Sequence, residues 1–97
     1  MQKKELADMV AEATRYSKYK VENTITQIFG VIAQQLSEGN EVYIRGFGPF
    51  TPQLRKAKKA RDINRNKLIV VPEHYTAKLR PSKSLDKYIN IKHGKQI

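Results

Sequence analysis

The sequence contains no cysteine, and its first residues contain no long apolar stretch. The absence of cysteine excludes disulfide bonds, thiolate nucleophiles and cysteine-based zinc sites. The N-terminal segment MQKKELADMV already has acidic residues at positions 5 and 8, which argues against a signal peptide or a membrane span. We therefore expect a cytoplasmic protein that has no membrane partner.

Groups of residues that perform catalysis or bind metals are also missing. His74 and His93 are isolated in the sequence, with no metal-ligand spacing and no evident nucleophile nearby. His74 is expected to be a packed or solvated residue at the end of a strand. The sequence thus predicts a protein that is not an enzyme, with no catalytic residue, metal, cofactor or small-molecule substrate.

Positive charge, in contrast, is abundant and unevenly distributed. The chain has 19 Lys and Arg against 9 Asp and Glu, a formal net charge of +10. Residues 1–40 contain five cations and five acids, whereas residues 41–97 contain 14 cations and four acids and so carry the whole excess. Such asymmetry indicates a polyanionic partner, with nucleic acid favoured over an anionic membrane.

Two segments of the neutral part have the spacing of amphipathic helices, and they predict a helical hairpin. The first helix is expected over residues 3–14 and the second over 18–37, with Ser17 as N-cap and Gly39 at the stop. Because a chain of 97 residues buries a comparatively small fraction of its surface, the apolar stripes are expected in core or dimer packing. The stripes consist of Leu6, Met9, Val10, Ala13, Val21, Ile25, Ile28, Phe29, Ile32 and Leu36.

After Gly39 the apolar residues recur with period two, which predicts strands. A first strand is expected around Val42 and Ile44, and a second from about Phe50. The segment GFG at 46–48 is interpreted as a structural turn, because a phosphate-binding loop would have a third glycine and lead into a helix. Proline at positions 49 and 52 cannot donate ladder hydrogen bonds, so the second strand is expected at a sheet edge or with bulges at its start.

The stretch RKAKKARDINRNK, residues 55–67, contains seven cationic side chains and one carboxylate. A disordered tail, a solvated helix face and a β-ribbon all produce such a run. The apolar residues 68–71 that follow disfavour a disordered tail, and we favour a ribbon in which residues 53–61 pair with 66–72. Asn64 and Asn66 tolerate the left-handed backbone of a tight turn. A cationic two-stranded ribbon fits a groove of duplex DNA and neutralises phosphates.

Ile63 is an isolated apolar residue within this cationic stretch. It is either an unimportant exposed aliphatic residue or a wedge that enters a base step from the minor groove and kinks the duplex. Farther along the chain, a short helix is expected over residues 82–90, with Ser82 as N-cap and Leu85, Tyr88 and Ile89 on one face. Residues 91–97 are expected to form a flexible tail.

The order of elements resembles the bacterial HU and integration-host-factor family of histone-like DNA-bending proteins from about residue 3 to residue 90. The most specific similarities are GFG with Phe50, the cations Arg55, Lys58 and Arg61, and the segment RPSKSL. The resemblance implies an α+β fold with an N-terminal helical hairpin, a three-stranded antiparallel sheet with a long protruding β-ribbon arm, and a short C-terminal helix. It implies one DNA-binding domain over residues 1–90, with a helical base at 3–38, sheet and arm at 41–79 and the helix at 82–90, in an intertwined dimer.

The function implied by the resemblance is that of a nucleoid-associated protein that binds duplex DNA through the minor groove and phosphates and bends or compacts it. Little sequence specificity is expected, and the dimer is either a homodimer or a heterodimer with a paralogue. Lys83 is also expected to hold phosphate because it lies at a helix N-terminus. The candidate DNA-binding residues are Arg55, Lys56, Lys58, Lys59, Arg61, Arg65, Lys67, Arg80 and Lys83, with Ile63 as intercalating wedge.

Several positions depart from the family's pattern. The family usually has Asn-Pro at the arm tip, where this chain has Asp62 and Ile63, and the turn glycine is replaced by Asn66. These differences concern the degree of bending more than DNA binding. The alternatives are a site-specific bending factor that uses indirect readout, an RNA-binding or ribosome-associated basic protein, and a scaffold whose arm contacts an acidic protein.

Overall fold

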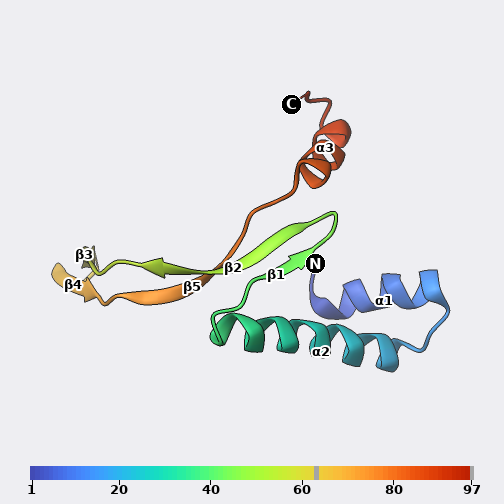
Figure 1. Cartoon of the computed structure of the whole chain (residues 1–97), viewed down its shortest axis with the longest axis horizontal. Helices are drawn as coiled ribbons and strands as arrows, with labels where there is room; N and C mark the ends of the chain where they lie inside the picture. Colours follow the sequence, from blue (N-terminus) through green and yellow to red (C-terminus); the bar gives the residue numbers. More distant parts are fainter. Residues whose placement is uncertain (63, 97) are drawn as a thin grey trace. The chain divides into compact units, whose positions relative to one another are not determined.

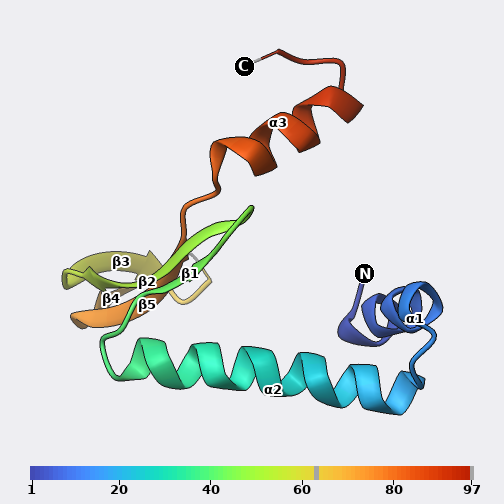
Figure 2. The same cartoon turned by 45° about the vertical axis from the view of Figure 1, so that its right-hand side comes forward.

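The computed structural model describes residues 1–62 and 64–96, and the chain divides into two compact units, Met1–Gln35 and Leu36–Ile97. In the described residues the elements follow the order α1, α2, β1, β2, β3, β4, β5, α3 (Figures 1 and 2). None of the described helices is long and apolar enough to cross a membrane.

The first unit contains α1 (Lys3–Thr14) and most of α2 (Lys18–Ser37), with the bounds that the sequence predicts. Ser17 caps α2, because its hydroxyl accepts a hydrogen bond from the N–H of Lys20 (3.1 Å). Helix α1 ends where Arg15 adopts the left-handed conformation (φ 62°). The predicted turn between the helices is therefore confirmed.

Few side chains of this unit are buried. Ala7, Ala11 and Val21 form a small buried cluster against which Ile25 packs, and Ile32 is also buried. Much of the predicted apolar stripe is exposed in the single chain, including Ile28 (48%) and Phe29 (55%). One copy of the helical hairpin thus leaves most of its apolar face uncovered.

The second unit contains a three-stranded antiparallel sheet of β1 (Val42–Ile44), β2 (Gly48–Arg55) and β5 (His74–Leu79) in the order β1-β2-β5. The predicted strands are present, but β2 is central and its pairing with β5 runs without interruption from Phe50↔Leu79 to Arg55↔His74. The prediction that the prolines place this strand at an edge or in a bulge is therefore only partly correct, because β2 is central at residues 48–50 and has a paired strand on one side only from Thr51 to Arg55.

The prolines are accommodated because Pro49 lies opposite the segment just past the end of β5, and Pro52 lies beyond the first residue of β1. The N–H of Arg80 donates to the carbonyl of Pro49 (3.2 Å), so the backbone of Pro49 faces the segment that follows β5. Successive residues of an antiparallel strand face opposite neighbours, so Pro52 faces β1. Since β1 begins at Val42, which pairs with Phe50, none of its residues lies opposite Pro52.

The predicted arm is a two-stranded antiparallel ribbon of β3 (Lys58–Asp62) and β4 (Lys67–Val71). In Figure 1 it can be followed from the end of β2 through β3 and back through β4 into β5. The predicted pairing of residues 53–61 with 66–72 is only partly correct, because residues 53–55 pair with 74–76 in the larger sheet. Residues 56–57 and 72–73 belong to no strand. Five residues at about 3.3 Å each give a ribbon of about 16 Å, shorter than a ribbon that begins at residue 53.

The chain ends with α3 (Lys83–Lys92). As predicted, Ser82 is its N-cap, and the hydroxyl of Ser82 accepts a hydrogen bond from the N–H of Leu85 (3.2 Å). The helix continues two residues beyond the predicted end at 90, so residues 91 and 92 are helical and do not belong to a tail.

Candidate nucleic-acid interface

The three-stranded sheet has one polar face and one apolar face. Residues paired across strands lie on the same face, and alternate residues of a strand share it. The registers therefore place the polar and cationic residues of β2 and β5 together, and they place the aliphatic and aromatic residues on the opposite face. The polar face of β2 and β5 consists of Thr51, Gln53, Arg55, His74, Thr76 and Lys78. The apolar face contains Val42, Ile44, Phe50, Leu54, Tyr75, Ala77 and Leu79.

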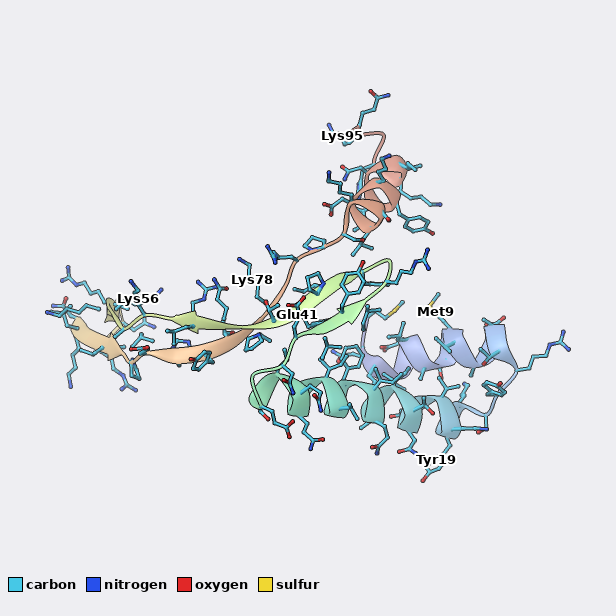
Figure 3. All side chains as sticks on the ribbon, in the orientation of Figure 1. Met9, Tyr19, Glu41, Lys56, Lys78 and Lys95 are labelled. Atoms are coloured by element: carbon cyan, nitrogen blue, oxygen red, sulfur yellow. The ribbon has the colours of Figure 1, made fainter. Side chains whose placement is uncertain are left out.

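The predicted cations of the arm are all exposed and extend from this polar face toward the tip. Arg55 ends β2, and Lys56 lies in the connection to β3. In Figure 3 the side chains of Lys56 and Lys78 extend to the same side of the ribbon. The cations Lys58, Lys59 and Arg61 lie on β3, Arg65 lies in the turn, and Lys67 begins β4.

Within the arm, the two strands differ in character. The cations of β3 face aliphatic partners on β4, since Lys59 pairs with Val70 and Arg61 pairs with Leu68. Leu68 and Val70 are 74% and 64% exposed. The arm thus presents cations beside apolar side chains, a composition that suits contact with phosphates and with the less polar floor of a DNA groove.

The tip of the arm is held by a contact between two residues that flank the turn. The guanidinium of Arg61 donates a hydrogen bond to the side-chain carbonyl of Asn66. Asn66 adopts the left-handed conformation (φ 50°), as the sequence predicts. Ile63, the predicted wedge, lies outside the described residues.

The predicted flank residues Arg80 and Lys83 are positioned by the GFG turn. The carbonyl of Phe47 accepts a hydrogen bond from the N–H of Ser82 (2.7 Å), and the hydroxyl of Ser82 donates to the carbonyl of Gly46 (3.1 Å). These bonds fasten the start of α3 to a turn that precedes it by more than thirty residues.

Lys83 is the first residue of α3, and Arg80 lies three residues before it. The first N–H groups of a helix lack intrahelical acceptors and carry partial positive charge. Together with the two cations they form a surface suited to a phosphate group. The place of Lys83 at the helix N-terminus is the one that the sequence predicts, and phosphate binding by Arg80 and Lys83 stays a prediction.

Sequence reasoning missed the contribution of β5 to the polar face. His74, Thr76 and Lys78 alternate with Tyr75 and Ala77, and this alternation is visible in the segment HYTAKL. It indicates a two-faced strand, but only the pairing with β2 shows that Arg55 lies on the same face as His74.

Among the described residues, no three His, Asp or Glu side chains come together as a metal site requires.

A family model, related sequences and a solved structure that match this chain are all of bacterial DNA-binding proteins. The family model described as bacterial DNA-binding protein matches residues 1–90. The DNA-binding protein HU of Thermotoga maritima is 35% identical over 85 residues, covering 88% of this chain and 94% of that protein. The integration host factor subunit beta of Colwellia psychrerythraea is 30% identical over 92 residues, covering 94% of this chain and 97% of that protein. A cocrystal structure of Anabaena HU with DNA has a TM-score of 0.83 at 28% identity, covering 92% of this chain and 97% of that chain.

Proposed function

The chain belongs to the bacterial DNA-binding protein family, which includes HU and integration host factor, and on this premise we propose that it binds duplex DNA and bends or compacts it. It is an architectural protein of the nucleoid, and it acts in the cytoplasm because chromosomal DNA lies there. The observation that carries the proposal is the continuous series of exposed cations from the polar face of the sheet along the arm.

The proposed interface uses the arm cations together with Arg80 and Lys83. A ribbon of this width fits a DNA groove, and each neutralised phosphate releases counterions. The base-edge contacts that a recognition helix makes are not needed for such binding, so sequence specificity is low. Ile63 at the arm tip acts as the wedge that unstacks a base step from the minor groove.

The active form is proposed to be an intertwined dimer in which residues 1–90 of each chain act as one DNA-binding domain. Its support is the incomplete core of the single chain. Helices α1 and α2 leave an apolar hollow of about 550 Å³ whose lining includes Val10, Val21 and Ile28. Ile28 and Phe29 are exposed although they lie on the apolar stripe. Side chains of a second copy would remove this surface from water, with a gain of about 25 cal/mol per Å² of apolar area.

A salt titration tests DNA binding and the role of the arm together. The affinity for a random duplex of about 20 base pairs is measured by fluorescence anisotropy at salt concentrations from about 50 to about 300 mM, which gives the slope of log affinity against log salt. Arg61→Ala should weaken binding and reduce the slope of log affinity against log salt by about 0.9 for each arm that contacts DNA. Lys18→Ala, which removes a cation that pairs with Asp8 on the helical hairpin, is the matched control and should leave the slope unchanged.

Two results would contradict the proposal. Preference for structured RNA over duplex DNA in direct competition would favour an RNA-binding protein. If log affinity falls with log salt at the same slope for Arg61→Ala as for the unmodified protein, Arg61 does not contact the DNA phosphates and the arm is not part of the interface.

A second candidate function is site-specific bending, which the similarity to integration host factor subunit beta favours. Such a protein reads the deformability of its site as well as the charge. Affinity for a candidate site more than about 1,000 times that for random duplex in the same salt would support it.

A further inference from the structure

An open concavity lies at the root of the arm, where β2 continues into β3 and β4 continues into β5. Its volume is about 500 Å³. The strands are interrupted on both sides here, at residues 56–57 and 72–73. The lining residues are Arg55, Lys56, Lys58, Val71, His74 and Thr76.

Among the residues that the structure describes, the lining is cationic and has no acidic member. Arg55 comes from β2, Lys56 from the connection, and Lys58 from β3. None of these three side chains has an acidic partner among the described side chains. Glu73, next to His74 in the chain, does not line the concavity. The described charges that meet at this place are thus positive or, for the imidazole of His74, able to become positive.

The imidazole of His74 is oriented by the backbone. Its Nδ1 lies 2.9 Å from the carbonyl oxygen of Pro72. A carbonyl oxygen only accepts hydrogen bonds, so Nδ1 carries the hydrogen and donates it. The other ring nitrogen, Nε2, is then an acceptor in the neutral ring and a donor in the protonated ring. Protonation therefore converts the free side of the ring from one that repels phosphate oxygens to one that binds them.

His74 also lies directly opposite Arg55 in the β2–β5 ladder. Directly opposed residues have Cβ atoms about 4.5–5.5 Å apart, and like charges in this arrangement are unfavourable. An anion between the two side chains would remove the repulsion and accept a hydrogen bond from each. Charge-assisted bonds of this kind are stronger than bonds between neutral groups.

We propose that this concavity binds a phosphodiester group of the DNA backbone, and that His74 acts there as a protonation-dependent phosphate ligand through Nε2. Arg55 and Lys58 hold the phosphate at any pH, and His74 adds a further charge-assisted hydrogen bond when it is protonated. The affinity for DNA is therefore expected to be higher at low pH, where the imidazole is protonated and donates from both ring nitrogens. This inference rests on the proposed DNA binding.

The test is a set of anisotropy titrations with a random 20-base-pair duplex at pH 5.5 to 8.5 and constant ionic strength. The unmodified protein should bind about fivefold more tightly at pH 6 than at pH 8, which corresponds to a single charge-assisted bond weakened by solvent exposure. His74→Gln cannot acquire the charge and should lose this pH dependence. His74→Lys should bind tightly throughout the range. His93→Gln, at the end of α3, is the matched control and should behave like the unmodified protein.

A pH dependence that persists unchanged in His74→Gln overturns the inference and leaves the proposed function intact. Failure of the unmodified protein to bind duplex DNA at any pH overturns the proposed function itself. The source of the phosphate is tested by following the imidazole resonances of His74 by NMR. They should shift on addition of an equimolar duplex and respond only weakly to millimolar inorganic phosphate. A shift with inorganic phosphate and none with duplex would also overturn the inference.

Discussion

The backbone carbonyl of Arg80 lies so close to Gly48 that a Cβ atom added to this glycine would overlap the carbonyl oxygen. The same Cβ would lie 3.1 Å from the carbonyl carbon of Arg80 and 3.2 Å from the amide nitrogen of Ser82. Gly48 also has a φ of 127°, which L side chains rarely adopt. The approach of the flank segment to the sheet thus requires the absence of a side chain at position 48.

Gly48→Ala should therefore destabilise the protein strongly. The atoms that obstruct the new methyl group are backbone atoms, so either the sheet or the start of α3 must shift, and we expect a loss of about 3 kcal/mol or more. Gly46→Ala is the matched control, because Gly46 also has positive φ (88°) but no atom within 4 Å of an added Cβ. Its expected loss is about 1–2 kcal/mol from backbone strain alone. Thermal unfolding at equal protein concentration measures both, and similar losses for the two variants would contradict the expected overlap.

Ser82→Ala should loosen the start of α3. The variant loses the cap to Leu85 and the bond to the carbonyl of Gly46, and loss of an N-cap costs about 1 kcal/mol. Because Arg80 and Lys83 flank this residue, affinity for duplex DNA should also fall, by about threefold. Ser84→Ala, in the first turn of the same helix, should change stability by less than about 0.5 kcal/mol. Calorimetry compares the stabilities of the two variants, and titration compares their affinities for duplex DNA. Equal losses of stability for Ser82→Ala and Ser84→Ala would exclude the capping role of Ser82.

Ile28→Asp tests the dimer. If the exposed apolar stripe of α2 is covered by a second copy, a carboxylate at this position is buried without a partner, which strongly disfavours association. The variant should sediment as a monomer or unfold, whereas Asn23→Asp on the same helix should remain dimeric. For the unmodified protein the unfolding temperature should rise with concentration, since association stabilises the folded chain. A folded monomer with a concentration-independent transition at micromolar concentration would be incompatible with this prediction.

Ile63→Ala should reduce the bend angle of bound DNA more than it reduces affinity. This prediction rests on the sequence, where Ile63 stands alone between cationic segments. Truncating an intercalated side chain lowers the kink while the phosphate contacts of the arm remain. Energy transfer between dyes at the ends of a duplex measures the bend. Ile91→Ala, which removes exposed aliphatic atoms at the end of α3 and away from the arm, is the control and should leave the transfer efficiency unchanged. An unchanged efficiency for Ile63→Ala would refute the wedge.

The helices were predictable from the sequence because their determinants are local. The spacing of Leu6, Met9 and Val10 and the caps at Ser17 and Ser82 lie within a few residues of the helices that they define. The left-handed turn at Asn66 was predictable for the same reason, since it depends on the residue's own side chain. Only the end of α3 was misplaced, and helix ends are the least determined part of such patterns.

The features that the sequence did not reveal depend on residues far apart in the chain. The central place of β2 depends on where β1 and β5 end relative to its prolines. The ribbon is interrupted at residues 56–57 and 72–73 because residues 53–55 pair with residues 74–76 of β5 in the larger sheet. The role of the GFG turn as an anchor for α3 depends on the hydrogen bonds between Ser82 and residues 46 and 47. His74 joins the candidate interface only because it pairs with Arg55.

The placement of Pro52 has a consequence for self-association in crowded conditions. Among the described residues, no strand pairs with β2 on the side of β1 beyond that short strand, and an unpaired strand side is a template for pairing with a strand of another molecule. Pro52 is directed to this side and has no N–H, so an incoming strand would lack one hydrogen-bond donor there. The proline that leaves the folded sheet undisturbed therefore disfavours edge-to-edge pairing between neighbouring molecules.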